Sequence, residues 1–409
     1  MSKLVVASYC TTFLKSEMLH IYRQVTALRD VRTFVMTKKV QNNDRFPFDD
    51  IELIPAPRRN PFRHGWLKFV ERKPPIVYRG EYQLLAHLLE RRGADLMHIY
   101  FGHTGVHLLP FIECWDKPCI VSFHGADVML KAESPDYAVK LRRVFHSVPL
   151  VLARSRSLEQ RLISLGCPPE KIRINRTGIP LEQFPLVRRE APEGGRWRFL
   201  QACRLIPKKG LTTCLRAFAV FRRENPRAEL FIAGKGPLQP KLEALAAQLG
   251  VGDHVHFTGF LSQTDLLELY HSCHVFVHPS EMPADENQEG IPNSILEAMA
   301  TGMPVLATRH GGIPEAVEEG RCGALVDERD HLALAAEMKK ITRTRHSFGE
   351  MGVLASESVA AHFEQRVHIA QLEAYYRESL EIAEMADARE RSERPLVESH
   401  FQQERVPVK

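Results

Sequence analysis

Two glutamates, Glu289 and Glu297, are the strongest candidates for chemistry in this sequence. They enclose the segment Glu-Gly-Ile-Pro-Asn-Ser-Ile-Leu-Glu. Pro292 is placed to open a helix and Gly302, further along the chain, to close it. The backbone N–H groups of residues 290–294 would then lie at the positive end of that helix, where a pyrophosphate binds well. Glu289 precedes the helix and Glu297 lies about one turn inside it, so the two carboxylates can hold different parts of one extended ligand, such as two sets of sugar hydroxyls. The alternative is that Glu297 caps its own helix and Glu289 is a solvated surface residue.

Two long cations follow the strand expected at 198–203. Arg204 and Lys209 would lie at the carboxyl edge of the sheet, where they can neutralise the charge that grows on a departing diphosphate. Lys208 is their neighbour, and in the alternative interpretation all three are surface cations beside a turn. The chain has no Asp-x-Asp element with which a divalent metal could hold the phosphates. We therefore expect no metal site and no other cofactor.

A histidine and an aspartate follow a strand of the first half, in the segment Ser122-Phe-His124-Gly125-Ala-Asp127. His124 can accept a hydrogen bond from a sugar, and Asp127 can orient that sugar or bind a hydroxyl. The alternative is that His124 is a structural residue at the end of its strand. In the second half, glycine turns at 234–236 and 258–260 also follow strands, and both a ligand-binding and a purely structural role are open for them.

The elements that must position these residues are short apolar runs that alternate with segments of helical periodicity. This pattern predicts parallel sheets covered by helices on both faces. A helix is expected at 16–29, with Ser16 as its N-cap. Strands are expected at 3–8, 32–36, 95–100, 118–123, 149–153 and 172–174, and in the second half at 198–203, 229–233, 254–258, 274–278, 304–308 and 323–326.

A chain of 409 residues is too long for one ordinary core, and two Rossmann-like α/β domains are the natural division. We place the first domain at 1–185, a linker at 186–197 and the second domain at 198–360. A return helix is expected at 361–386, and the charged tail at 387–409 is expected to be disordered.

Composition and charge favour a cytoplasmic protein. The eight cysteines include no Cys-x-x-Cys pair, which favours reduced thiols. The apolar run at the N-terminus is shorter than the core of a secretory signal and fits a first buried strand better. Residues 1–187 carry a net charge of +10 and the remainder −5. This asymmetry indicates an anionic partner for the first half, either a membrane surface or a phosphate-bearing acceptor, unless it is only a solvated basic face.

A segment between Pro57 and Arg79 is the candidate for membrane contact at the inner face of the membrane. Phe62, Trp66 and Phe69, followed by Val70, recur at helical spacing. A short helix of this kind can insert its aromatic face among the headgroups of an anionic membrane. The alternative is an ordinary helix whose aromatic stripe packs on its own sheet. The cations of the segment are Arg58, Arg59, Arg63, Lys68, Arg72, Lys73 and Arg79, against a single acid, Glu71.

The segment from Glu289 to Glu297 resembles the Glu-(any seven)-Glu signature of the family 4 retaining glycosyltransferases of GT-B fold. The continuation Ala-Met-Ala-x-Gly-x-Pro-Val and the later Gly311-Gly-Ile-Pro-Glu315 fit the same family. In the first half, the segment from Thr12 to Glu17 resembles a loop of polysaccharide-assembly members, including colanic-acid transferases. The run that starts at His98 resembles their His-x-His-Phe-Gly run. Tyr100 replaces its second histidine, and the twin glycine that many relatives carry near Thr12 is missing. The resemblance covers about residues 1–380.

The resemblance implies a GT-B fold, in which two Rossmann-like domains have parallel sheets that face a central cleft and a C-terminal helix packs back on the first domain. The acceptor would bind the first domain and the donor the second. The implied catalytic residues are His124, Asp127, Arg204, Lys209 and Glu289. The implied donor-binding residues are Gly234, Gly236, Gly259, Gly290, Ile291, Pro292, Asn293, Ser294 and Glu297. Those implied on the acceptor side are Thr12, Ser16, Glu17, His98 and Tyr100.

The function that this resemblance implies is transfer of a hexosyl unit from a nucleotide diphosphate sugar, with retention of anomeric configuration and without a metal. Glu289 would contact the hexose and Glu297 the ribose of the nucleotide. The acceptor would be a saccharide or a lipid-linked saccharide, and no nucleic-acid partner is expected. A nucleotide-sugar epimerase of the same architecture and a non-catalytic sugar-nucleotide-binding protein are the alternatives.

Overall fold

Seven parallel strands form the sheet of the first domain, in the order β5-β3-β1-β6-β7-β8-β9. The computed structural model describes residues 3–14, 18–42, 46–55, 61–125, 128, 135–284 and 288–393. The strands are β1 Val5–Tyr9, β3 Arg32–Thr37, β5 Ile51–Leu53, β6 Leu96–Tyr100, β7 Cys119–Phe123, β8 Val151–Ala153 and β9 Ile172–Ile174. The central strands β6 and β7 are buried along their whole length, because helices cover both faces of a sheet built from βαβ units.

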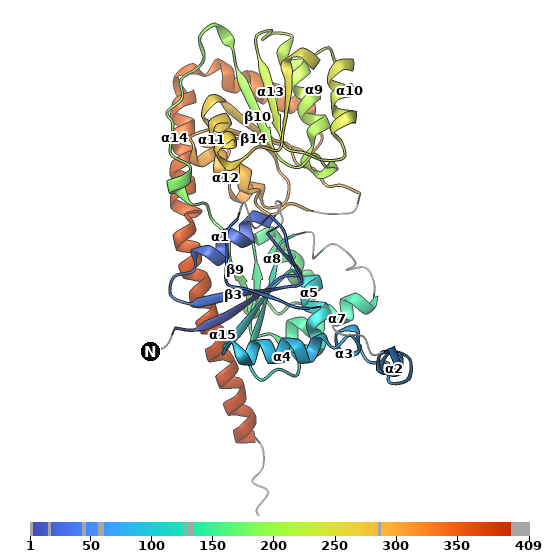
Figure 1. Ribbon diagram of the computed structural model, residues 1–409. Helices are drawn as coiled ribbons and strands as arrows, with labels where there is room; N and C mark the ends of the chain where they lie inside the picture. The colour runs from blue at the N-terminus through green and yellow to red at the C-terminus, as the bar shows by residue number, and fades with distance from the viewer. Residues whose placement is uncertain are drawn as a thin grey trace, which may run out of the picture.

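The helices of the first domain connect these strands in sequence (Figure 1). They are α1 Leu19–Ala27, α2 Pro61–Gly65, the π-helical turn η2 Trp66–Val70, α3 Pro75–Tyr78, α4 Glu81–Arg91, α5 Gly102–Ile112, α7 Pro135–Ser147 and α8 Arg156–Ser164. A second small sheet pairs β2 (Thr12–Phe13) with β4 (Lys39–Val40). The main core of the domain lies between the sheet and the helices α4, α5 and α7.

Six parallel strands form the sheet of the second domain, in the order β12-β11-β10-β13-β14-β15. They are β10 Arg198–Ala202, β11 Glu229–Ala233, β12 Val255–Gly259, β13 Val275–His278, β14 Val305–Thr308 and β15 Gly323–Val326. The helices are α9 Leu211–Arg222, α10 Gln239–Gln248, α11 Gln263–Ser272, α12 Asn293–Ala300, α13 His331–Arg343 and α14 Arg345–His362. Strand order reverses at β10, and a ligand crevice is expected at such a switch point.

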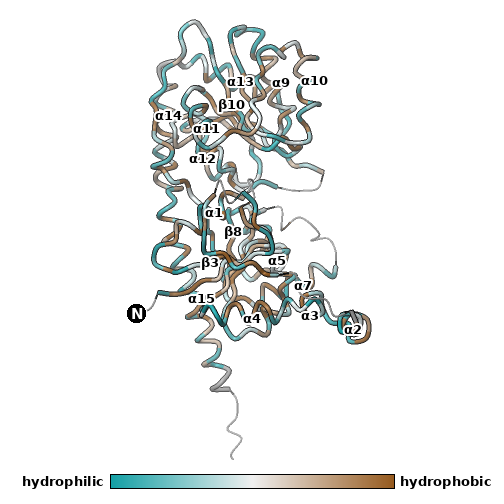
Figure 2. Tube along the Cα trace, in the orientation of Figure 1, coloured by the Kyte–Doolittle hydropathy of each residue, from teal (hydrophilic) through white to brown (hydrophobic). Residues whose placement is uncertain are grey.

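The predicted two-domain α/β architecture is confirmed. Each expected strand is present within two residues of its predicted bounds, and the strands at 172–174, 229–233 and 323–326 match them fully. Figure 2 shows hydrophobic residues along the strands of both sheets, as strands buried on both faces require. The strands β2, β4 and β5 were not predicted, because they are two or three residues long and carry little apolar pattern.

The C-terminal helix α15 (Gln365–Glu393) returns to the first domain and runs along it, as expected (Figure 1). Leu372 and Tyr376 join a core cluster with residues of β1, β6 and β7. One carboxylate oxygen of Glu373 also accepts hydrogen bonds from the N–H groups of Arg29 and Asp30, at 2.7 and 2.8 Å. Two expectations need correction, since the return starts at Gln365 rather than 361 and residues 387–393 are helical. Residues 394–409 lie outside the described part of the chain.

The expected linker at 186–197 is fastened to the second domain rather than extended between the two. The buried guanidinium of Arg189 donates to the carbonyls of Cys273, Tyr270 and Thr301. Trp197, at the end of this segment, is buried in the core of the second domain. A single buried arginine thus satisfies several carbonyls at once, and burial lowers its pKa to about 10.

The segment formed by α2 and η2 projects from the side of the first domain (Figure 1). Its four large apolar side chains are solvent-exposed, at 89% for Phe62, 58% for Trp66, 71% for Phe69 and 57% for Val70. The alternative that this stripe packs on its own sheet is therefore wrong. Arg58 and Arg59 lie outside the described residues. Over the residues that the structure describes, no helix combines the length and the apolar character that a membrane span needs.

Candidate functional site

The carboxylate of Glu289 lies against two lysines at the domain interface. Its Oε1 is 2.7 Å from Nζ of Lys209 and 3.3 Å from Nζ of Lys208. All three side chains are at most 11% exposed. Burial alone raises the pKa of the Glu289 carboxyl, but the attraction of Lys209 and Lys208 outweighs it and holds the pKa well below its usual range. Glu289 is therefore neither solvated nor at the surface, as one interpretation of the sequence had it.

The loop that carries Glu289 is fixed by Gly311 and by two residues that the sequence patterns did not single out, His310 and Glu328. The backbone N–H of Glu289 donates to Nε2 of His310 at 3.1 Å, and Nδ1 of His310 pairs with Glu328 at 2.6 Å. A Cβ added at Gly311 would lie 2.1 Å from the carbonyl oxygen of Glu289. Gly311 also has a φ of +55°, so this glycine is required for the close approach of the two loops. The sequence did offer one indication of this role, since His310 directly precedes the Gly311-Gly312 pair.

The helix that follows Glu289 begins as predicted. Pro292 is the N-cap residue of α12 and Asn293 is its first helical residue. Gly302, just after the helix, has a φ of +83°, which fits its predicted role as the terminating glycine. The N–H groups at the start of α12 are therefore available to an anion, as those of any helix start are.

Glu297 lies one turn inside α12 and is 6% exposed. Its Oε2 accepts a hydrogen bond from the hydroxyl of Tyr270 at 3.0 Å, and its Oε1 accepts from Nη1 of Arg23 at 2.7 Å. Burial, with a further contribution from Glu297, raises the pKa of Tyr270 well above its usual value, so the phenol stays a donor. The alternative that Glu297 caps its own helix is not what the structure shows. The two glutamates thus occupy separate environments.

A cavity of about 380 Å³ opens between the carboxyl edge of the second sheet and the start of α12. Arg204, Gly234 and Ser294 line it, together with Lys235 and Phe260. Arg204 is exposed at this cavity, whereas Lys208 and Lys209 are buried against Glu289. The three cations therefore divide into one exposed at the cavity and two paired with the carboxylate.

The glycine turns beside the cavity are shaped by close backbone packing. A Cβ at Gly234, where φ is +135°, would lie 1.9 Å from the carbonyl oxygen of Cys203. A Cβ at Gly236 would lie 2.4 Å from that of Leu205. The N–H of Gly234 donates to the carbonyl of Gly259 at 2.7 Å. The two turns are thus joined to each other, and each contributes to the cavity lining, through Gly234 and Lys235 in one and Phe260 in the other.

His124 directly follows β7, at the carboxyl edge of the first sheet. Its Nε2 is 3.0 Å from the hydroxyl of Ser122, and its ring centroid is 5.0 Å from that of His20. Burial, followed by the charges of His20 and Arg154, holds the pKa of His124 well below its usual value. The imidazole is therefore neutral near pH 7 and acts as a hydrogen-bonding group rather than a cation.

The residues assigned to the acceptor side are only partly brought together. Thr12 lies on β2 near the start of the loop that leads to α1, while Ser16 and Glu17 lie outside the described residues. Asp127, from the expected catalytic set, lies outside them as well. His98 and Tyr100 are fully buried on β6, which corrects their expected place at the acceptor site. The helix α1 begins at Leu19 rather than Ser16, after Met18 as N-cap.

The physical reason for that correction is the return helix. Nδ1 of His98 pairs with the hydroxyl of Tyr376 on α15 at 2.9 Å, and its ring stacks on Tyr100 at 4.1 Å between centroids. Burial lowers the pKa of His98 to about 3, which keeps it neutral in this core. His98 therefore helps to attach α15, while the ring of Tyr100 lies 5.9 Å from that of His124, measured between centroids.

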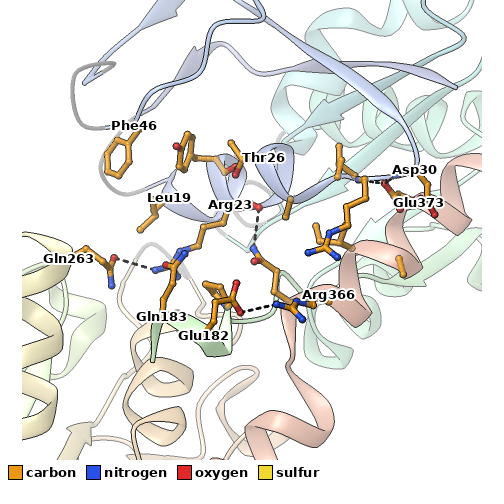
Figure 3. A pocket seen from close by; sticks show the side chains of 18 residues that line it. Leu19, Arg23, Thr26, Asp30, Phe46, Glu182, Gln183, Gln263, Arg366 and Glu373 are labelled. Atoms are coloured by element: carbon orange, nitrogen blue, oxygen red, sulfur yellow. Dashed lines mark hydrogen bonds and ion pairs between the residues drawn. The ribbon is translucent and has the colours of Figure 1, made fainter. Parts of the chain in front are cut away.

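Several polar contacts join the two domains around this site. Arg176 of the first domain pairs with Glu315 of the second at 2.6 Å, and Nη2 of Arg154 donates to Oδ1 of Asn293 at 3.3 Å. Nε2 of Gln288 donates to the hydroxyl of Ser157 at 3.0 Å. A second cavity of about 590 Å³ lies on the α15 side of the interface, between α1, α11 and α15 (Figure 3). The carboxyl edges of the two sheets thus meet at one interface.

Residues 29–183 match the family described as Glycosyltransferase Family 4, and residues 184–352 match Glycosyl transferases group 1. The amylovoran biosynthesis glycosyltransferase AmsK of Erwinia amylovora is 33% identical over 281 residues, which cover 68% of this chain and 69% of AmsK. The colanic acid biosynthesis glycosyltransferase WcaL of Salmonella typhimurium is 33% identical over 282 residues, with the same shares of the two chains.

Solved structures of related shape agree with the fold. The Anabaena protein HepE, crystallised in complex with UDP, gives a TM-score of 0.73 at 19% identity and covers 92% of this chain and 100% of its own. Sucrose-phosphate synthase of Thermosynechococcus elongatus gives the same TM-score at 19% identity, over 92% of this chain and 99% of its own. Two facing Rossmann-like domains, a returning C-terminal helix and these matches lead to one assignment: the chain belongs to the family 4 glycosyltransferases, with the GT-B fold.

Proposed function

We propose that this chain transfers a hexosyl unit from a nucleoside diphosphate sugar to a saccharide or lipid-linked saccharide acceptor, with retention of configuration, in the assembly of an exopolysaccharide. The observation that carries the proposal is the buried Glu289 carboxylate, held by Lys208 and Lys209 in front of the start of α12. The relatives named for amylovoran and colanic acid biosynthesis support the exopolysaccharide assignment.

The proposed roles follow from the positions of the charged groups. The diphosphate binds between the N–H groups at the start of α12 and the cations Arg204, Lys208 and Lys209. These cations stabilise the negative charge of the leaving diphosphate, each by an amount on the order of 2–4 kcal/mol. The cavity of about 380 Å³ beside Arg204 receives the nucleoside. Glu289 then meets the hexose hydroxyls and Glu297 those of the ribose.

Retention is proposed to occur by attack on the same face that the leaving group occupies. Among the residues that the structure describes, no Asp or Glu is placed by motif as a nucleophile, since Glu289 is engaged by two lysines. The leaving phosphate itself can accept the proton of the acceptor hydroxyl. Neutral His124 can hold a substrate hydroxyl nearby by a hydrogen bond.

A panel of nucleoside diphosphate sugars tests this function. We expect one donor class to raise the melting temperature and to be hydrolysed slowly without acceptor and faster with a saccharide acceptor. NMR of the product would show the anomeric configuration of the donor retained. Conversion of the hexose into its epimer without release of a nucleoside diphosphate would instead establish an epimerase. Binding without any turnover across donors and acceptors would establish a sugar-nucleotide-binding protein.

We also propose that the exposed segment 62–79 docks on an anionic membrane. Phe62, Trp66 and Phe69 project into solvent, and the surrounding cations would meet lipid phosphates, as in other interfacial helices. Nζ of Lys68 already lies over the ring of Phe69, at 4.9 Å from its centroid. A lipid-linked acceptor would be reached most easily by an enzyme attached to the membrane in this way.

Liposome co-sedimentation tests this docking. Binding should require anionic lipid, weaken with salt and fall at least about tenfold when Arg63, Lys68 and Lys73 become serine, since each cation near the surface contributes roughly 1 kcal/mol. A control variant places serine at three exposed cations of the second domain, which should leave binding unchanged. These three control positions are Arg223, Lys340 and Arg343. Equal binding to neutral liposomes, or no binding to anionic ones, would contradict the proposal.

A further inference from the structure

An arginine of the first domain reaches across the interface to a carboxylate of the second. Arg23, on α1, donates from Nη1 to Oε1 of Glu297 at 2.7 Å, and the two side chains are only 7% and 8% exposed. The residues are 274 positions apart in the chain. The other carboxylate oxygen accepts from Tyr270 at 3.0 Å. Glu297 is thus held by one donor from each domain.

The guanidinium of Arg23 is itself fixed from several sides. Its Nη2 donates to Oε1 of Gln263 on α11 at 3.3 Å, and its Cζ lies 5.5 Å from the ring centroid of the buried Phe184. Nε2 of Gln365 donates to the carbonyl oxygen of Arg23 at 3.1 Å, which fixes the backbone. Figure 3 shows the side chain of Arg23 extended toward Gln263, beside the cavity of about 590 Å³. Because the planar guanidinium of Arg23 is fixed in this way, it can donate to the Glu297 carboxylate in only one orientation.

The carboxylate of Glu297 keeps free hydrogen-bonding capacity in this arrangement. An ionised carboxylate offers about four lone-pair sites, and the two protein donors occupy one on each oxygen. The remaining sites can accept the two vicinal hydroxyls of a ribose. Removal of the arginine would leave a buried negative charge without its partner and free the carboxylate to rotate.

We propose that Arg23 is a positioning residue for the nucleotide, which aims Glu297 at the ribose hydroxyls from the opposite domain. The inference rests on the proposed function, in which Glu297 binds the ribose. It extends that function, because the donor site of the second domain is then complete only when the first domain contacts it. Donor affinity therefore depends on a residue of the acceptor-binding domain.

Calorimetric titration of the whole protein tests this role. UDP, GDP and ADP are titrated first, and the nucleotide that binds most tightly is compared with its 2′,3′-dideoxy form. Arg23→Gln should weaken binding of the ribonucleotide about tenfold, as expected for loss of a charge-assisted contact that orients a ligand group. The dideoxy form, which has no hydroxyl for Glu297, should be affected less than about twofold. Arg23→Lys, which keeps the charge without the fork, should give an intermediate loss.

A matched control is Arg176→Gln, which removes another ion pair between the domains, to Glu315 at 2.6 Å, without touching Glu297. It should leave the ratio of ribonucleotide to dideoxynucleotide affinity unchanged. If Arg23→Gln weakens both nucleotide forms equally, Arg23 serves only domain contact, and the proposal is overturned. Unchanged ribonucleotide affinity in Arg23→Gln also overturns it. So does increased affinity, because Arg23 would then compete with the ribose for Glu297.

Failure of the underlying function gives a different result. If wild-type protein binds the ribonucleotide and its dideoxy form equally, the assignment of Glu297 to the ribose is wrong. If it binds none of the nucleotides, the proposed function itself is refuted. Thermal melting of each variant separates these outcomes from misfolding. If Arg23→Gln does not fold, Arg23→Lys carries the comparison, and an unaltered ratio in that variant then counts against the proposal.

Discussion

Replacement of Glu289 by glutamine changes the charge of the site while it keeps the shape of the side chain. The carboxylate contacts Nζ of Lys209 at 2.7 Å and Nζ of Lys208 at 3.3 Å, and all three groups are buried. Glutamine carries no negative charge, so the positive charge of both lysines would be available to attract the diphosphate. We therefore expect nucleoside diphosphate affinity to be kept within about threefold, or to rise, while hexose transfer falls.

The size of the effect follows from the contact that is lost. A hydrogen bond in which one partner is charged contributes about 1.5–3 kcal/mol, which corresponds to about a 10- to 150-fold fall in kcat/KM. Most of the fall should be in kcat, because the hexose contact matters most as the bond to the diphosphate breaks. The loop should keep its place, since the backbone of Glu289 is held by His310 at 3.1 Å.

The assay is the rate of nucleoside diphosphate release with donor and acceptor, together with calorimetric titration of the nucleoside diphosphate alone. Glu281→Gln is the matched control, because Glu281 lies after the same strand β13 but its carboxylate contacts Thr213 at 3.3 Å and Arg329 at 3.7 Å. The control should keep kcat/KM within about twofold. Wild-type kinetics in Glu289→Gln, with an unchanged melting temperature, would refute the assignment of Glu289 to the hexose.

Three further predictions concern the metal, pH and the linker. Initial rates should be unchanged in excess EDTA, because Arg204, Lys208 and Lys209 supply the charge for the diphosphate; loss of activity that Mg²⁺ or Mn²⁺ restores would contradict this. Burial raises the pKa of Glu81, but hydrogen bonds from His107 and Lys38 outweigh it and hold the pKa at about 2. Because this folded-state pKa is depressed, its contribution to stability should be complete above the unfolded pKa of about 4.3 and lost as pH falls toward 2. Glu81→Gln should therefore be less stable at pH 7 by about 1.5–3 kcal/mol and show a flatter acid unfolding curve. Arg189→Met should lower the free energy of unfolding in urea by about 3 kcal/mol or more, since several carbonyls lose a buried donor. The exposed neighbour variant Arg188→Met should stay within about 0.5 kcal/mol of wild type.

The parts of this protein that depend on local pattern could be predicted from the sequence. The apolar runs predicted both sheets because a strand covered on both faces must be apolar along its length. Pro292, Gly302 and the glycine turns predicted where α12 begins and ends, since each of these residues suits only a few backbone conformations. The sequence therefore predicted that Glu289 and Lys209 lie near each other at the edge of the second sheet, where they are 2.7 Å apart.

Long-range packing decided the rest. The sequence pattern around His98 predicted an acceptor residue, but the tertiary fold lays α15 against that strand and gives His98 the hydroxyl of Tyr376 as its partner, 278 positions away. For Phe62 and Trp66, the sequence pattern left open whether they pack on the sheet. They are exposed because α2 and η2 project from the domain. The contact between Arg23 and Glu297 depends on how two separate domains meet. The periodicity of one segment cannot predict such a contact. It indicates which helix or strand the segment forms, but not which distant surface will pack against it.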